Sequence, residues 1–161
     1  MTKSLWPDVI GATKVNGQRS AVSILREQAA LLGEKTQNLV IAKVDSRAGQ
    51  ESDLFGNVLE GMLSKKIDTT AHQVSHRFYD IFYLVAPALN NYRFELFRVT
   101  HSIEQHYPLR IYSGTLDING QEITSEKELL EVLALIFSHL KTINIIETML
   151  IQSGWSAENI G

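Results

Sequence analysis

Two long alternating segments near the centre of this chain, residues 72–86 and 92–103, constrain its fold more than any other feature. Both faces of the first segment are apolar, with Val74, Phe78, Phe82, Leu84 and Ala86 on one and Tyr79, Ile81, Tyr83 and Val85 on the other. The second segment puts Tyr92, Phe94 and Leu96 on one face and Phe97, Val99 and Ile103 on the other. A sheet with one face in water would carry polar residues at every second position. We therefore expect both faces of this sheet to be shielded from water.

Three kinds of cover are open for the second face of the sheet. The helices predicted at the two ends of the chain can cover one face. The other face needs the segment Asp53–Lys66, a second protomer or a ligand. Burial of apolar surface is worth roughly 25 cal/mol per Å², so an uncovered aromatic face would associate. Its tyrosines favour an interface or a cavity, because each has an apolar ring and a polar tip.

Further strands and turns surround this pair. A β-branched segment at residues 38–44 predicts a buried strand, and Pro87–Asn91 predicts the turn between the two long strands. Residues 108–113 predict a third strand. Asn119-Gly120 lies between the short alternating segments 116–118 and 121–123, which predicts a two-residue hairpin turn.

Helices are predicted at both ends of the chain. Apolar residues recur at helical spacing after Ser20, and Gly33 is placed to end that helix. Ser125 and Glu128 form a capping box, in which the glutamate would bond back to the cap amide. A second C-terminal helix is expected to be capped by Thr142 and to stop at Gly154.

The elements together predict an α+β fold: a mainly antiparallel, twisted sheet of about four to six strands, with one N-terminal and two C-terminal helices. The chain has 161 residues, which favours a single domain over 1–161. Within it we expect an irregular arm (1–18), a helix (19–33), a sheet region (38–124) with a helical or loop insertion (49–70), a helix pair (125–153) and a loose tail (154–161).

Composition and charge exclude several classes of function. With no cysteine, the chain has no disulfide, zinc-thiolate site or thiol nucleophile. A net charge of -3 argues against nucleic acid as a partner. The start lacks a secretory signal and the longest apolar stretch is too short to span a bilayer, so we expect a cytoplasmic protein with no membrane partner.

Charge is spread unevenly along the chain. Residues 1–48 hold seven basic and four acidic side chains, whereas residues 115–161 hold two basic and seven acidic ones. Two explanations are open: either the two ends lie side by side within one fold, or opposite ends attract each other between subunits.

The search for chemistry gives candidates but no complete catalytic or metal site. His72 and His76 would lie ~13 Å apart on a strand, too far to share a zinc ion. His101 and His106 flank a turn and can approach each other, but they lack a third ligand. Asp80 is a polar residue in an apolar strand, and Arg98 is a possible partner across the hairpin. The motifs of serine hydrolases, P-loops and dinucleotide sites are missing, so we expect no cofactor and no metal.

These observations lead to two main hypotheses. The first is a small interaction module without chemistry of its own, which forms a homo-oligomer through an apolar sheet face or binds a protein partner of unknown identity. The second is a small-molecule binding or hydrolytic domain with a pocket between the sheet and residues 53–66. A third, a neutralising partner of a toxin or phage component, rests on small size and mild acidity alone. The residues expected at an interface or ligand site are Tyr79, Tyr83, Phe97, Arg98 and His101.

Overall fold

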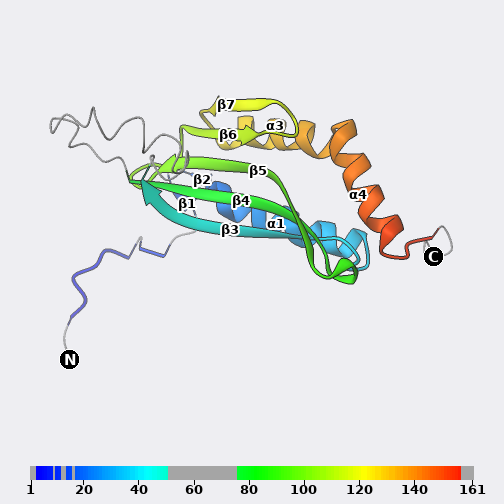
Figure 1. The fold of residues 1–161 in the computed structure, drawn as a ribbon. Helices are drawn as coiled ribbons and strands as arrows, with labels where there is room; N and C mark the ends of the chain where they lie inside the picture. The colour runs from blue at the N-terminus through cyan, green and yellow to red at the C-terminus, as the bar shows by residue number, and fades with distance from the viewer. Residues whose placement is uncertain (1–2, 9, 12–13, 16, 51–75, 157–161) are drawn as a thin grey trace, which may run out of the picture.

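In the part of the chain that the structure describes, the fold is an antiparallel five-stranded sheet with three α-helices (Figure 1). The computed structural model describes residues 3–8, 10–11, 14–15, 17–50 and 76–156. Its sheet has the order β3-β4-β5-β6-β7, with bounds Ile41–Gln50, His76–Ala86, Tyr92–Ser102, Leu109–Ser113 and Ile118–Ile123. The helices are α1 (Ala21–Lys35), α3 (Glu126–Ser138) and α4 (Leu140–Gln152). The predicted α+β class, with one N-terminal and two C-terminal helices, is confirmed.

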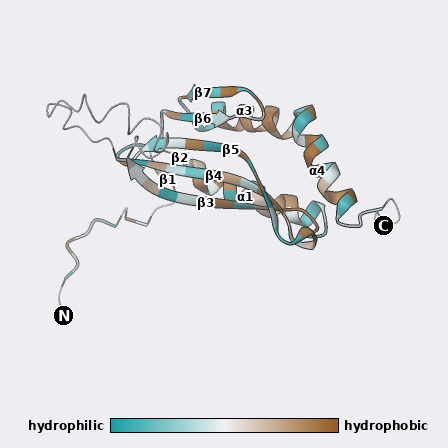
Figure 2. Cartoon of the chain, viewed as in Figure 1, coloured by the Kyte–Doolittle hydropathy of each residue, from teal (hydrophilic) through white to brown (hydrophobic). Residues whose placement is uncertain are grey.

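One face of the sheet packs against all three helices and forms the main hydrophobic core. Ile24 and Leu25 of α1, Leu129 and Ile136 of α3, and Met149 of α4 belong to the same buried cluster as the strand residues. The strand residues of that cluster are Phe82, Leu84, Ala86, Leu96, Phe97, Val99, Leu109, Ile111 and Ile123. Figure 2 shows apolar segments recurring along the strands and helices of this layer.

A β-bulge between β4 and β5 changes which side chains share a face. Phe82 lies opposite Phe97, but the next residue, Tyr83, lies opposite Glu95, so Leu96 is the extra residue. The predicted division of β5, with Phe94 and Phe97 on different faces, is therefore wrong. A bulge shifts the alternation by one residue, and this one brings both phenylalanines to the helical side.

A second bulge overturns the predicted Asn119-Gly120 hairpin. β7 runs straight through this dipeptide, and Gly120 is the extra residue between the pairs Ile111–Gln121 and Tyr112–Asn119. Gly120 has a φ of 77°, the left-handed conformation that glycine adopts at such bulges. The turn itself lies at residues 114–117, where Asp117 has a φ of 56°.

Helix α1 begins as predicted but ends later. The Ser23 amide donates to the Ser20 hydroxyl, which confirms the N-terminal cap. Gly33 lies inside the helix instead of ending it, and the chain turns at Gln37 and Asn38, whose φ angles are 53° and 64°. A Cβ on Gly33 would lie 3.0 Å from Asn38 Oδ1, so this glycine allows close approach of the returning chain. The strand predicted at 38–44 begins at Ile41 and extends to Gln50.

The C-terminal helices differ from prediction at their caps. Ser125 caps α3 as predicted, but Glu128 accepts hydrogen bonds from the amide and hydroxyl of Thr124, not from the cap amide. Thr142 is buried inside α4, and His139 caps that helix by accepting a bond from the Lys141 amide. Helix α4 ends at Gln152, and the predicted Gly154 follows its C-cap Ser153 with a φ of 94°.

Residues 1–18 are not wholly irregular, because β1 (Lys14–Val15) and β2 (Gln18–Arg19) form a short antiparallel ribbon. The expected insertion at 49–70 lies outside the described residues from 51 onward, as does the segment Asp53–Lys66. Among the described helices none is long and apolar enough to cross a membrane alone; α3 and α4, bent by 55°, pass that length-and-composition test only as a pair.

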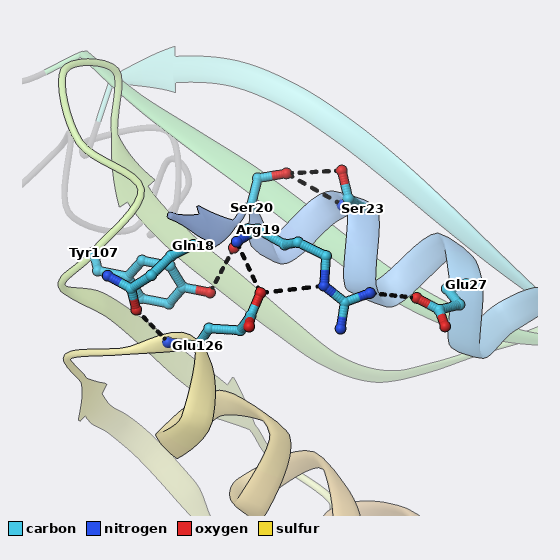
Figure 3. Close-up of polar contacts among 7 residues, drawn as sticks. All are labelled: Gln18, Arg19, Ser20, Ser23, Glu27, Tyr107 and Glu126. Carbon is cyan, nitrogen blue, oxygen red and sulfur yellow. Dashed lines mark hydrogen bonds and ion pairs between the residues drawn. The ribbon is translucent and has the colours of Figure 1, made fainter. Parts of the chain in front are cut away.

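The oppositely charged ends of the chain lie side by side (Figure 3). Arg19 bonds Glu27 through Nη1 at 2.6 Å and Glu126 through Nε at 3.1 Å. The Glu126 amide donates to Gln18 Oε1 at 2.8 Å, and the Tyr107 hydroxyl donates to the Arg19 carbonyl at 2.9 Å. Basic and acidic ends therefore meet within one chain, the first of the two explanations for the uneven charge.

Candidate functional site

A hollow of about 570 Å³ lies between α1, α4 and the sheet, and we call it the helix groove. Its floor is formed by Phe82, Leu84 and Leu96, all nearly inaccessible to water. Its walls come from Leu31 of α1 and Ile143 of α4. The volume is in the range of small-molecule pockets, and the lining is mainly apolar.

The sequences of α1 and α4 explain why apolar side chains line both walls. Leu31 and Leu32 continue the apolar stripe of α1, and Ile143, Ile146 and Leu150 repeat at helical spacing on α4. At the end of α4, Trp155 also lines the groove. Its amide donates to the Leu150 carbonyl and Gly154 has a φ of 94°, the hydrogen-bonded cap that turns the chain after a helix.

The exposed rim of the helix groove is partly apolar and partly charged. Leu31 is 48% exposed and Ile143 38%, although both are large aliphatic side chains. Lys35 on α1 and Glu147 on α4 line opposite walls, and neither forms an ion pair among the described residues. The groove thus presents an apolar floor between two unpaired opposite charges.

Helix α4 carries more exposed apolar surface next to this groove. Leu140 is 69% exposed and Ile151 67%. Leu140 lies two turns before Glu147 and Ile151 one turn after it, on the side of α4 that continues outward from the groove. A helix that is apolar around most of its circumference is normally buried on several sides, so α4 lacks cover in the isolated chain.

Three of the five predicted site residues come together on the opposite face of the sheet. Tyr79, Tyr83 and Arg98 line a hollow of about 340 Å³ together with Arg47. The guanidinium of Arg93 lies 4.1 Å from the centre of the Tyr83 ring, and Arg98 pairs with Glu95 at 2.6 Å. This face mixes aromatic rings with charges, so it is less apolar than the β4 sequence alone indicates.

Most of the apolar side chains that β4 places on this second face are shielded from water, as predicted. Tyr79 is 5% exposed, Ile81 4% and Val85 3%, yet none of them belongs to the main core cluster. The face therefore offers a partner little accessible apolar surface.

Phe97 lies elsewhere, on the helical face. Its ring stacks on Phe82 with centroids 5.0 Å apart and also contacts Phe137 of α3. It is fully buried, so it cannot meet a ligand on the face that carries Tyr79 and Tyr83.

His101 belongs to a buried polar cluster that sequence reasoning did not assemble. Asp80, 2% exposed, accepts a hydrogen bond from the Ser46 hydroxyl at 2.6 Å. His101 Nε2 lies 3.4 Å from Asp80 Oδ2, and the His101 ring stacks on that of His106, with centroids 6.0 Å apart and a 9° tilt. Asp80 lies opposite Val99, so its charged neighbour is His101, and the alternative partner, Arg98, points to the other face.

The geometry of this cluster fits a structural role better than catalysis. His101 Nδ1 lies 3.0 Å from the Ser102 carbonyl and Nε2 faces Asp80, so both ring nitrogens are engaged. A general base needs a free nitrogen within reach of its substrate. The expected approach of His101 and His106 is seen, but the described residues contain no group of three potential ligands that could hold a metal ion.

The helix groove was missed because the predicted helices were expected to cover one face of the sheet, with no groove between them. The available signal was the broad apolar circumference of α4, from Leu140 to Ile151. Comparison with known proteins adds no assignment: no family model, no curated protein and no solved structure shows significant similarity to this chain.

Proposed function

We propose that this protein is a small cytoplasmic interaction module without chemistry of its own, which self-associates through the helix groove and the exposed side of α4. The observation that carries the proposal is the helix groove, with apolar side chains exposed on its rim. Exposed apolar patches bounded by polar residues mark interaction surfaces. The lack of cysteine agrees with a reducing compartment.

Exposure favours the helices over the sheet as the interface. Leu140 and Ile151 are each more than two-thirds exposed, whereas Tyr79 and Ile81 on the second sheet face are at most 5% exposed. Burial of accessible apolar area drives association, and that area lies on the helical side.

Charge favours a second copy of the chain as the partner. Lys35 and Glu147 stand on opposite walls of the groove. In a dimer with a two-fold axis each contact occurs twice, so Glu147 of one copy can meet Lys35 of the other and the reverse. Such an arrangement neutralises both charges while the apolar side of α4 is covered.

The experiment is sedimentation of the full chain over about a hundredfold range of concentration. We expect a monomer–dimer equilibrium that Ile143→Lys abolishes, because it puts a charge at the apolar rim. Ile103→Lys is the matched control, since Ile103 is 59% exposed and does not line the groove. A strict monomer at high concentration contradicts the proposal.

A charge exchange tests the identity of the partner. Lys35→Glu and Glu147→Lys should each weaken the dimer by about threefold to tenfold, since exposed ion pairs are individually weak. The double variant should recover the wild-type affinity because the two charges have changed places. Failure of the double variant to recover contradicts the two-fold arrangement.

Small-molecule binding is the second candidate function, and the volume of the helix groove favours it. About 570 Å³ of mainly apolar space suits a drug-sized apolar ligand. The pocket first expected for this function, between the sheet and residues 53–66, involves residues outside the described range. A chain that stays monomeric but binds a fluorescent apolar dye, with loss of binding in Ile143→Lys, would support this candidate over self-association.

A further inference from the structure

We infer that Asp80 and His101 hold one proton between them in the folded protein, and that loss of this proton loosens the end of the sheet and the loop of residues 103–108. The inference concerns the buried polar cluster and is independent of the helix groove.

The imidazole ring of His101 forms a hydrogen bond on the side that faces away from Asp80. His101 Nδ1 lies 3.0 Å from the Ser102 carbonyl oxygen, which can only accept a hydrogen bond. Nδ1 therefore carries a hydrogen. In a neutral imidazole the other nitrogen, Nε2, then carries only a lone pair.

Nε2 of His101 faces the buried carboxylate of Asp80. Asp80 Oδ2 lies 3.4 Å away, is buried, and has no hydrogen-bond partner in the described structure. A lone pair opposite a carboxylate oxygen repels it, and a buried acceptor without a donor is costly. One additional proton between Nε2 and Oδ2 removes both problems. The other oxygen, Oδ1, already accepts the Ser46 hydroxyl, which fixes the carboxylate in place.

The Asp80–His101 pair supports the loop that joins β5 to β6. His106 lies in this loop and stacks on His101, while its own Nδ1 is buried without a hydrogen bond. The next residue, Tyr107, donates its hydroxyl to the Arg19 carbonyl. A shift of the His101 ring therefore removes the surface on which His106 rests.

The titratable and charged groups around His101 set the direction of the effect. They are Asp80 and Arg77 on β4 and His106 in the loop; β3 contributes the neutral Ser46. Burial alone lowers the pKa of His101. The hydrogen bond that a protonated Nε2 donates to Asp80, the bond to the Ser102 carbonyl and the charge of Asp80 together outweigh burial and the charge of Arg77, so the pKa of His101 lies above its ordinary value of 6.5. The contact thus stabilises the fold fully below pH 6.5, and this stabilisation is lost as pH rises through the raised pKa.

The test begins with the wild-type full chain. We follow the histidine ring signals by NMR against pH and assign His101 from the signal missing in His101→Gln. We expect His101 to titrate above pH 6.5. As His101 loses its charge, the amide protection factors of residues 102–107 should fall. Titration of His101 below 6.5, or unchanged protection across its titration, overturns the inference.

Thermal melts of variants give a second readout. The melting temperature of the wild type should fall by about 3–6 °C from pH 6 to pH 9. His101→Gln and Asp80→Asn should lose most of this difference. His106→Phe keeps an aromatic ring for stacking but cannot titrate, so this variant should keep the fall in melting temperature between pH 6 and pH 9. If the variant loses this fall, His106 holds the proton and the inference is wrong.

The matched control is His139→Asn. This removes an exposed imidazole at the start of α4 while asparagine still provides an oxygen to cap the helix. It should leave the pH dependence unchanged. If this control loses the pH dependence of the melting temperature, the assignment to Asp80 and His101 is contradicted. The NMR titration uses the wild-type chain, so it still tests the inference if a buried variant fails to fold.

Discussion

Arg19 donates two hydrogen bonds to a single carboxylate oxygen of Glu126, one from its backbone amide at 2.8 Å and one from Nε at 3.1 Å. The two residues are 107 positions apart in the chain. The contact links the residue just before the cap of α1 to the first residue of α3, and so joins the starts of these two helices.

Glu126→Ala is expected to lower the free energy of unfolding by about 1–2 kcal/mol, because it leaves the part-buried Arg19 amide without its acceptor. Urea unfolding measures the loss. The control is Glu27→Gln, since Glu27 is 55% exposed and bonds only the outer end of Arg19; it should cost less than about 0.5 kcal/mol. Equal costs for the two variants would show that the backbone contact contributes nothing.

Phe97→Ala is expected to lower the free energy of unfolding by about 3–5 kcal/mol, because Phe97 is fully buried and stacks on Phe82. Tyr83→Ala should cost clearly less, since its side chain is only half-buried and lies outside the main core. Chemical denaturation of both variants compares them directly. A smaller loss for Phe97→Ala than for Tyr83→Ala would contradict the place of Phe97 in the main core.

Gly120→Ala is expected to destabilise the fold by more than about 1 kcal/mol. Its φ of 77° is strained for alanine, and an added Cβ would lie 3.2 Å from the Tyr112 ring. Gly114→Ala is the matched control in the same hairpin, where nothing lies within 4 Å and φ is not positive. Thermal melts should show Gly114→Ala at or above wild-type stability, and a loss equal to that of Gly120→Ala would contradict the bulge.

Thr36→Val is expected to cost about 1–3 kcal/mol, because the buried Thr36 hydroxyl donates to the Val40 carbonyl at 2.6 Å and valine cannot. The turn between α1 and β3 depends on this hydroxyl. Thr148→Val tests the same substitution at an exposed site on α4, where the effect should stay within about 0.5 kcal/mol. Equal losses in urea unfolding would indicate a general effect of valine and not the buried bond.

Local sequence patterns predicted the elements and the class of this fold well. Ser20 and Ser125 cap their helices because a short polar side chain at that position accepts an otherwise unpaired amide hydrogen. The long alternating segments form β4 and β5 because alternation matches the geometry of a strand.

The faces of the sheet could not be predicted with the same certainty. A bulge adds one residue to one strand, and every side chain beyond it changes face, yet no local pattern marks Leu96 as the extra residue. The hairpin turn predicted at Asn119-Gly120 was wrong because a glycine with positive φ suits a hairpin turn and a bulge equally.

The candidate sites depend on long-range packing and were predicted only in part. Tyr79, Tyr83 and Arg98 meet because they share one face near the β4–β5 pairing. The helix groove depends on how far α1 and α4 stand apart, and the Asp80–His101 contact depends on strand register. Neither quantity is encoded in the spacing of residues along a single segment.

The Gly120 bulge also has a consequence for how the molecule behaves in a crowded solution. β7 forms one margin of the five-stranded sheet, and a strand at a margin presents backbone groups to which another chain could add itself. The irregularity at Gly120 breaks the regular row of donors and acceptors along that margin. The bulge thereby disfavours edge-to-edge pairing of β7 with the sheet of another copy.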